Sequence, residues 1–173
     1  RLGGIFISQS HHDHGMDAPV FARKCGCNVY GSASTCNIAR GNGVPEHRIY
    51  SYEDAMAYRV GDFHISVIPS LHSRPHWYNN DIGMIVEEPF SMPAPKKAFK
   101  EGGSVDFLVT HRGRRYLIRP SYNYVDRQLD DIRADVLFLG IAGLSKDSRK
   151  GRERFFAATI GTVQPGLVIP IHW

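Results

Sequence analysis

Three apolar segments of this sequence each run into a loop that carries histidine. The segments are residues 2–8, 63–69 and 167–171, and each has the length and composition of a buried or half-buried strand. Binding sites are commonly built from loops at strand ends along one edge of a sheet. We therefore expect the sheets of this chain to bring three histidine-bearing loops together at one edge.

The first of these loops has the composition of a metal site. Four metal-competent side chains follow one another in it: His11, His12, Asp13 and His14. Imidazole nitrogens and carboxylate oxygens are ligands that zinc and similar divalent ions accept. The other two loops add His72 and His172. A single run of histidine and aspartate is more often a solvated turn, but three such loops at strand ends favour a metal site.

Composition is that of an ordinary globular protein. The 173 residues predict a single domain, residues 1–173, and 42% of them are hydrophobic. The 21 basic and 17 acidic residues leave a net charge of +4, which permits an anionic substrate and does not favour nucleic acid. No apolar run reaches the roughly 18 residues of a transmembrane helix.

The two ends of the sequence and its cysteines are informative about cellular localisation. The sequence does not begin with methionine, and it starts and stops beside expected strands, so we expect both ends to be incomplete. It contains no signal-peptide pattern. Three cysteines, an odd number, argue against a disulfide framework and predict reduced thiols. These features predict a cytoplasmic protein, although a targeting segment could lie outside the sequence.

Apolar periodicity and helix-capping signals predict the elements of a mixed α/β protein. Strands are expected at residues 2–8, 27–30, 49–52, 57–60, 63–69, 82–86, 105–110, 116–118, 134–139 and 167–171. Helices are expected at residues 17–24, 32–40, 126–132 and 148–160. Residues 89–100, with three prolines, predict a loop. Hairpins come before strand-helix-strand units, which indicates layered sheets of mixed type.

Taken in order, these motifs resemble the metallo-β-lactamase-fold metallohydrolases. Residues 8–14 resemble the His-x-His-x-Asp-His signature of that family, residues 69–73 its third motif and residues 169–173 its last ligand motif. Residues 133–141 resemble a strand of the branch that includes sugar-phosphate lactonases and N-acyl-phosphatidylethanolamine phospholipases. The resemblance implies a four-layer αβ/βα sandwich with metals at the sheet edge, truncated at the N-terminus because the family has several more N-terminal strands.

The resemblance also implies two metal positions. One would be held by His11 and His72, and the other by Asp13, His14 and His172. A hydroxide made nucleophilic by the metals would attack the substrate, and the catalytic residue Asp13 would hold the attacking water or accept its proton. The cofactor would be a divalent metal, with zinc expected and manganese or iron also compatible with these ligands.

Two positions depart from the family pattern. Gln9 stands where the family has its first histidine, and Ser121 stands where it has a carboxylate that bridges the metals. An amide oxygen is a weak neutral ligand, and a hydroxyl brings no negative charge. We therefore expect one firmly bound metal and a weak or empty first position. Three nearby carboxylates could replace the bridge, although helix capping is the more ordinary role for them: Asp126, Asp130 and Asp131.

The expected function is hydrolysis of an ester, lactone or phosphodiester in a small-molecule substrate, anionic or lipid-like. Arg74 could pair with a phosphate or carboxylate, and His76 and Trp77 could contact the substrate. Residues 74–80 and 89–103 would form a lid, with Phe90 and Phe99 among its apolar contacts.

Two alternatives remain open. Because of Gln9 and Ser121, natural or introduced, the chain could be a degenerate or engineered member that binds metal or ligand with little turnover. A nuclease-type phosphodiesterase is less favoured, because the positive charge is small and no stripe of basic and aromatic residues is present.

Overall fold

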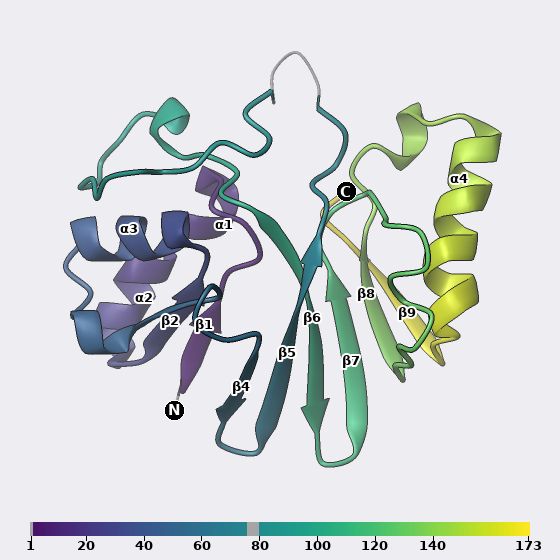
Figure 1. Cartoon of the computed structure of the whole chain (residues 1–173), viewed down its shortest axis with the longest axis horizontal. Helices are drawn as coiled ribbons and strands as arrows, with labels where there is room; N and C mark the ends of the chain where they lie inside the picture. Colours follow the sequence, from purple (N-terminus) through teal and green to yellow (C-terminus); the bar gives the residue numbers. More distant parts are fainter. Residues whose placement is uncertain (1, 76–79) are drawn as a thin grey trace.

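The computed structural model describes residues 2–75 and 80–173 and contains two β-sheets (Figure 1). The smaller sheet is parallel, with the order β1-β2-β3. Its strands are β1 (Gly4–Phe6), β2 (Asn28–Gly31) and β3 (Ile49–Ser51). The larger sheet has the order β4-β5-β6-β7-β8-β9. Its strands are β4 (Ala57–Val60), β5 (Phe63–Ser70), β6 (Ser104–His111), β7 (Arg114–Arg119), β8 (Val136–Gly140) and β9 (Leu167–Ile171).

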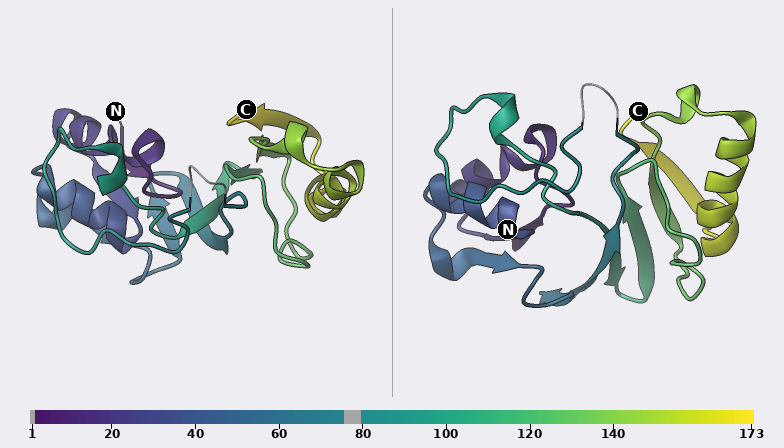
Figure 2. Two further views of the ribbon diagram at one scale, coloured as in Figure 1. Left: turned by 90° about the horizontal axis from the view of Figure 1, so that it is seen from above. Right: turned by 45° about the horizontal axis from the view of Figure 1, so that its top comes forward.

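Helices cover the outer face of each sheet. They are α2 (Ala18–Cys25), α3 (Ala33–Gly41) and α4 (Arg149–Phe156), which continues into a π-helical turn at Ala157–Gly161. The short helix α1 (His12–Gly15) is a single turn in the loop after β1. Figure 2 shows α2 and α3 on one side of the molecule and α4 on the other, with the sheets between them. Among the described residues, no helix is both long and apolar enough to cross a membrane.

Three clusters of buried side chains fill the spaces between the four layers. Helices α2 and α3 meet the smaller sheet through Ala22, Cys27, Val29, Ala39 and Val44. The two sheets meet through Tyr30, Tyr52, Ile65, Val67 and Phe107. The larger sheet meets α4 through Leu117, Leu129, Ala134, Leu137, Leu139, Phe155 and Val163. Burial of each large apolar side chain contributes about 1.5–3 kcal/mol. This layering confirms the expected αβ/βα sandwich.

Most of the expected elements are present within a few residues of their predicted bounds, but the strand expected at residues 82–86 is wrong. The amide of Gly83 donates to the carboxylate of Glu101, and the amide of Val86 donates to the hydroxyl of Ser34. Gly83 also has a positive φ of 79°, which bends the chain. The apolar residues of this segment therefore lie in a loop whose amides are bound by side chains.

The helix expected at residues 126–132 is also wrong. Arg127 has a φ of 64°, outside the right-handed helical region. The segment is a series of turns with bonds between residues three apart, such as that from the amide of Ile132 to the carbonyl of Leu129. Leu129 is buried against the core of the larger sheet. Burial of this one side chain favours the turns over a regular helix.

Candidate metal centre

The sheets deliver the three histidine loops to one edge of the molecule. Strand β6 is antiparallel to both β5 and β7, and β7, β8 and β9 are parallel, so β5 and β9 run in the same direction. His72 follows β5 and His172 follows β9. The first loop is joined to the larger sheet by a bond from the amide of Val105 to the carbonyl of Ser8. Its last residues form the single turn of α1, which lies beyond the end of β1 in Figure 1.

Asp13, His14 and His172, the residues expected to share one metal, lie close together. The Asp13 Oδ2 atom lies 3.6 Å from His14 Nε2 and 3.7 Å from His172 Nε2. One ligand atom from each of the three side chains lies within 4.8 Å of the others. Two ligands of one zinc ion are about 3–3.5 Å apart, so small side-chain movements suffice to place all three on a common ion.

The electrostatics of this trio suit a cation. His14 Nε2 is buried and has no hydrogen-bond partner among residues 2–75 and 80–173. Burial lowers the pKa of His14 to about 4, so its imidazole is neutral and keeps a lone pair at pH 7. The neighbouring His172 holds the pKa of Asp13 well below its ordinary range, so Asp13 is a carboxylate. A buried lone pair beside a carboxylate fits a divalent metal.

Hydrogen bonds to backbone carbonyls orient two of the histidines. His172 Nδ1 donates to the carbonyl of Pro120 over 3.1 Å, and His72 Nδ1 donates to the carbonyl of Ser73 over 2.8 Å. A carbonyl oxygen can only accept, so Nδ1 carries the proton and Nε2 keeps the lone pair in each neutral ring. Burial lowers the pKa of His72, which also favours the neutral form.

A loop between β7 and β8 holds both of these histidines. Its Pro120 carbonyl accepts the bond from His172, and its Asn123 side-chain amide donates to the carbonyl of His72 over 2.7 Å. The carbonyl of Asn123 in turn accepts a bond from Arg119, a fully buried residue at the end of β7. One loop therefore couples the placement of a ligand in each half of the centre.

The first metal position is less complete. The rings of His11 and His72 are 5.0 Å apart and nearly perpendicular. Gln9 is buried but lines the cavity of the site, whereas Ser121 is buried and is not among the residues that line it. Ser121 is therefore poorly placed to reach a bridging water.

The other aspartates considered for the bridge are not part of the site either. None of the three lines the site cavity: Asp126, Asp130 and Asp131. Asp130 is paired with Arg127 instead. Helix capping is excluded for them as well, because no helix forms there.

A cavity of about 620 Å³ opens over the centre. Its lining includes His11, Asp13, His72 and His172, together with three cationic side chains: Arg74, Lys96 and Lys146. His12 also lines it, but its half-exposed ring lies 3.5 Å from the other carboxylate oxygen of Asp13, on the side away from the trio's contacts.

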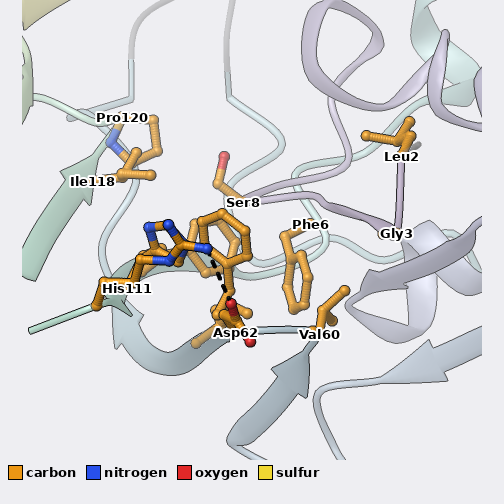
Figure 3. Close-up of a pocket in the computed structure, with 16 residues that line it drawn as sticks. Leu2, Gly3, Phe6, Ser8, Val60, Asp62, His111, Ile118 and Pro120 are labelled. Carbon is orange, nitrogen blue, oxygen red and sulfur yellow. Dashed lines mark ion pairs between the residues drawn. The ribbon is translucent and has the colours of Figure 1, made fainter.

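A second cavity, of about 790 Å³, lies between the two sheets and is mainly apolar (Figure 3). Phe6, Val60 and Ile118 line it, and its charged residues are an exposed ion pair between Asp62 and Arg112. Among the described residues, the one group of three potential metal ligands is the trio at the sheet edge. We therefore take the smaller cavity as the candidate site.

Two aromatic residues of the expected lid pack in a hydrophobic cluster instead of over the site. Phe90 and Phe99 pack against each other with ring centroids 5.1 Å apart, in a cluster with Ile38 of α3. They belong to the core and do not line the site cavity, so the expectation that they contact substrate is wrong. Of the other substrate-contact candidates, His76 and Trp77 lie outside the described residues.

Comparisons with known proteins agree with this architecture. No family model matches the chain, and no curated protein matches it. Among solved structures, Igni18, a metallo hydrolase from the archaeon Ignicoccus hospitalis, superposes with a TM-score of 0.60 and 14% identity over 99% of this chain and 64% of that one. YhfI from Bacillus subtilis, a metallo-β-lactamase-fold protein, superposes with a TM-score of 0.57 and 13% identity, over 99% of this chain and 65% of that one.

Human tRNase Z, short form, superposes with a TM-score of 0.57 and 12% identity, over 99% of this chain and 73% of that one. These likenesses show that the chain has the metallo-β-lactamase fold. The chain spans about 64–65% of the first two of these proteins. At identities of 12–14% the agreement concerns the fold, so activity has to be argued from the site.

Proposed function

We propose that this chain forms the catalytic centre of a metal-dependent hydrolase that cleaves an ester, lactone or phosphodiester. The observation that carries the proposal is the buried, unpartnered Nε2 of His14 beside Asp13 and His172, two residues that line an open cavity. Three protein ligands with an open position are the usual arrangement of a catalytic zinc site. PqqB from Methylobacterium extorquens, a structure with a TM-score of 0.55 to this chain, is described as Zn²⁺-bound, which supports zinc as the metal.

The residues of the chain would divide the work. When bound, a divalent ion supplies a Lewis acid that activates water and polarises the bond to be cleaved. His14 offers a neutral nitrogen, and His172 offers its Nε2 once the metal displaces a proton whose pKa the bond to Asp13 raises. The carboxylate of Asp13 can hold the attacking water or take its proton. The carbonyl of Pro120 fixes the ring of His172, so that its Nε2 faces Asp13.

The cavity mouth favours a substrate with a negative group. Arg74, Lys96 and Lys146 all line it, and a guanidinium such as that of Arg74 pairs well with phosphate or carboxylate. The carboxylate of Asp147, which lies there too, accepts bonds from the hydroxyl of Tyr122 and an amide. A phosphodiester or a carboxylate-bearing ester or lactone of small size fits these charges and the 620 Å³ volume.

Elemental analysis of purified protein, combined with a substrate panel, tests the proposal. The chain should hold at least one zinc ion and hydrolyse at least one of the three bond types. His14→Ala should lose both properties. His12→Ala is the matched control, because His12 is a neighbouring, half-exposed histidine outside the trio, and it should retain both. Wild-type protein with no bound metal after zinc loading would refute the proposal.

A second candidate function, a degenerate member that binds metal with little turnover, is supported by Gln9. This residue is a buried amide where the fold family has a ligand. Gln9→His should raise the metal content towards two ions per chain and increase hydrolysis if the centre is a weakened enzyme. If Gln9→His binds two ions and still cleaves nothing in the panel, the chain binds metal without turnover, and the second reading replaces the first.

A further inference from the structure

The carboxylate that contacts the first half of the centre comes from a residue that no motif indicates. His11 Nε2 lies 3.1 Å from Asp81 Oδ1 and 3.2 Å from Asp81 Oδ2, although the two residues are 70 positions apart in the sequence. The two side chains are largely buried, with exposures of 11% and 20%. An ionised carboxylate only accepts hydrogen bonds, so His11 Nε2 carries the proton and Nδ1 keeps the lone pair.

His11 therefore has the opposite neutral tautomer to the other two oriented histidines. His72 and His172 bind the protein through Nδ1 and keep Nε2 for a ligand. Their partners are neutral carbonyls, whereas the partner of His11 is an anion. A histidine that ligates a metal through one nitrogen commonly donates its other N–H to a carboxylate, which fixes the ring and adds negative charge behind it.

We propose that Asp81 is the positioning residue of the first metal site: it orients His11 through the Nε2–H bond, so that Nδ1 ligates, and supplies the negative charge that Gln9 and Ser121 do not. The proposal rests on the proposed metal-dependent function and extends it to the weaker half of the centre. It identifies which nitrogen of His11 binds and why this half can hold a cation without a bridging carboxylate.

The surroundings of Asp81 support a fixed position. The amide of Met84 donates to the carbonyl of Asp81, which closes a turn, and the preceding amide, of Gly83, donates to the carboxylate of Glu101. Glu101 is itself buried and also accepts bonds from Gly103 and Ser104, so its carboxylate is occupied. Among the described residues, Asp81 is therefore the carboxylate that bonds directly to a histidine of this half.

Zinc titration of the metal-free protein, followed by competition with a chelator, tests the role of Asp81. Wild-type protein should bind one ion tightly and a second weakly. Asp81→Ala should weaken the second step by about 10–100-fold and leave the first unchanged. Asp81→Asn, whose oxygen still accepts the N–H bond, should lose less than Asp81→Ala. Asp130→Ala is the control, because Asp130 is paired with Arg127 outside the cavity, and it should bind as wild type does.

Each contrary outcome has a distinct meaning. A single binding step in wild type, or a second step equal in wild type and Asp81→Ala, overturns the proposal and leaves the proposed hydrolase standing. Equal losses in Asp81→Asn and Asp81→Ala would show that the accepted hydrogen bond contributes nothing and would overturn the positioning role. Absence of any binding overturns the proposed function itself, and the proposal with it.

Nitrogen NMR of the metal-free protein at pH 8 provides a readout independent of metal. Two-bond ¹H–¹⁵N spectra distinguish the two neutral tautomers of each histidine ring. His11 should be the Nε2–H tautomer, and His72 and His172 the Nδ1–H tautomer. Asp81→Ala should abolish the preference of His11 alone. Nδ1–H at His11 in wild type would overturn the proposal.

Discussion

Asp106→Asn breaks a buried ion pair beside the loop that holds two histidines of the candidate metal centre. Asp106 on β6 and Arg119 on β7 are each 1% exposed, and Arg119 Nε donates to Asp106 Oδ2 over 2.7 Å. Asparagine keeps the shape of the side chain and removes its charge. The guanidinium is then left buried without a counter-charge, which is among the few single changes that destabilise a protein severely.

We expect this change to lower the free energy of unfolding by about 3–5 kcal/mol, the range for removing one partner of a buried pair. A domain of this size has about 5–15 kcal/mol in total, so the loss is readily measured. Arg119 Nη1 has no partner among the described residues, so the pair is incompletely satisfied. Replacing both partners with apolar residues, as in Asp106→Leu with Arg119→Met, should therefore be less costly than either single change.

Urea unfolding of the metal-free protein, followed by far-ultraviolet circular dichroism, measures the effect. Glu153→Gln is the matched control, because the Glu153 pair with Arg149 has a similar distance of 2.8 Å but is exposed, at 61% and 88%. The control should change stability by less than about 0.5 kcal/mol. A loss below about 1 kcal/mol in Asp106→Asn, or a loss equal to that of the control, would refute the reasoning.

Three further predictions concern other parts of the chain. Iodoacetamide at pH 8 should modify the exposed Cys25 and spare Cys36, because burial raises the pKa of Cys36 to about 11; peptide mass mapping checks this. Gly140→Ala should lower stability by about 1–3 kcal/mol and weaken zinc binding, measured by titration, because the new methyl group would collide with the carbonyl of Pro120. Acidifying metal-free protein should cost stability between pH 6.5 and 4, because folded His14, with a pKa of about 4, binds fewer protons there than the unfolded chain. The cost attributable to this group is up to about 3 kcal/mol, and His14→Gln should remove it in urea unfolding at the two pH values.

The layers of the fold could be predicted because they depend on local signals. Residues 63–69 alternate in hydrophobicity, and strand β5 buries Ile65 and Val67 on one face. Ser32 accepts a bond from the amide of Thr35 at the start of α3, as serine commonly does at a helix N-cap. Such patterns lie within a few residues of the element that they specify.

The sequence-based predictions fail where hydrogen bonds from distant side chains determine the backbone conformation. Residues 82–86 have the composition of a strand, but Val86 binds Ser34, a residue 52 positions away, and Gly83 binds Glu101. No local pattern shows those bonds. The contact between Asp81 and His11 was missed for the same reason, since Asp81 lies in a loop outside every motif. The one available signal was a carboxylate directly before a turn that contains glycine.

The weak binding expected at the first metal position would be chemical in origin and would not come from the architecture. The hydroxyl of Ser104 lies 3.3 Å from Gln9 Oε1 but 2.5 Å from a carboxylate oxygen of Glu101. A hydroxyl has one hydrogen, and the shorter, charge-assisted bond takes it, so the Gln9 oxygen is only weakly engaged. His11 and His72 are in place whatever residue stands at position 9, because separate strands deliver them and separate partners orient them. Restoring a histidine at position 9 therefore adds a ligand to an existing site and requires no rebuilding of the fold.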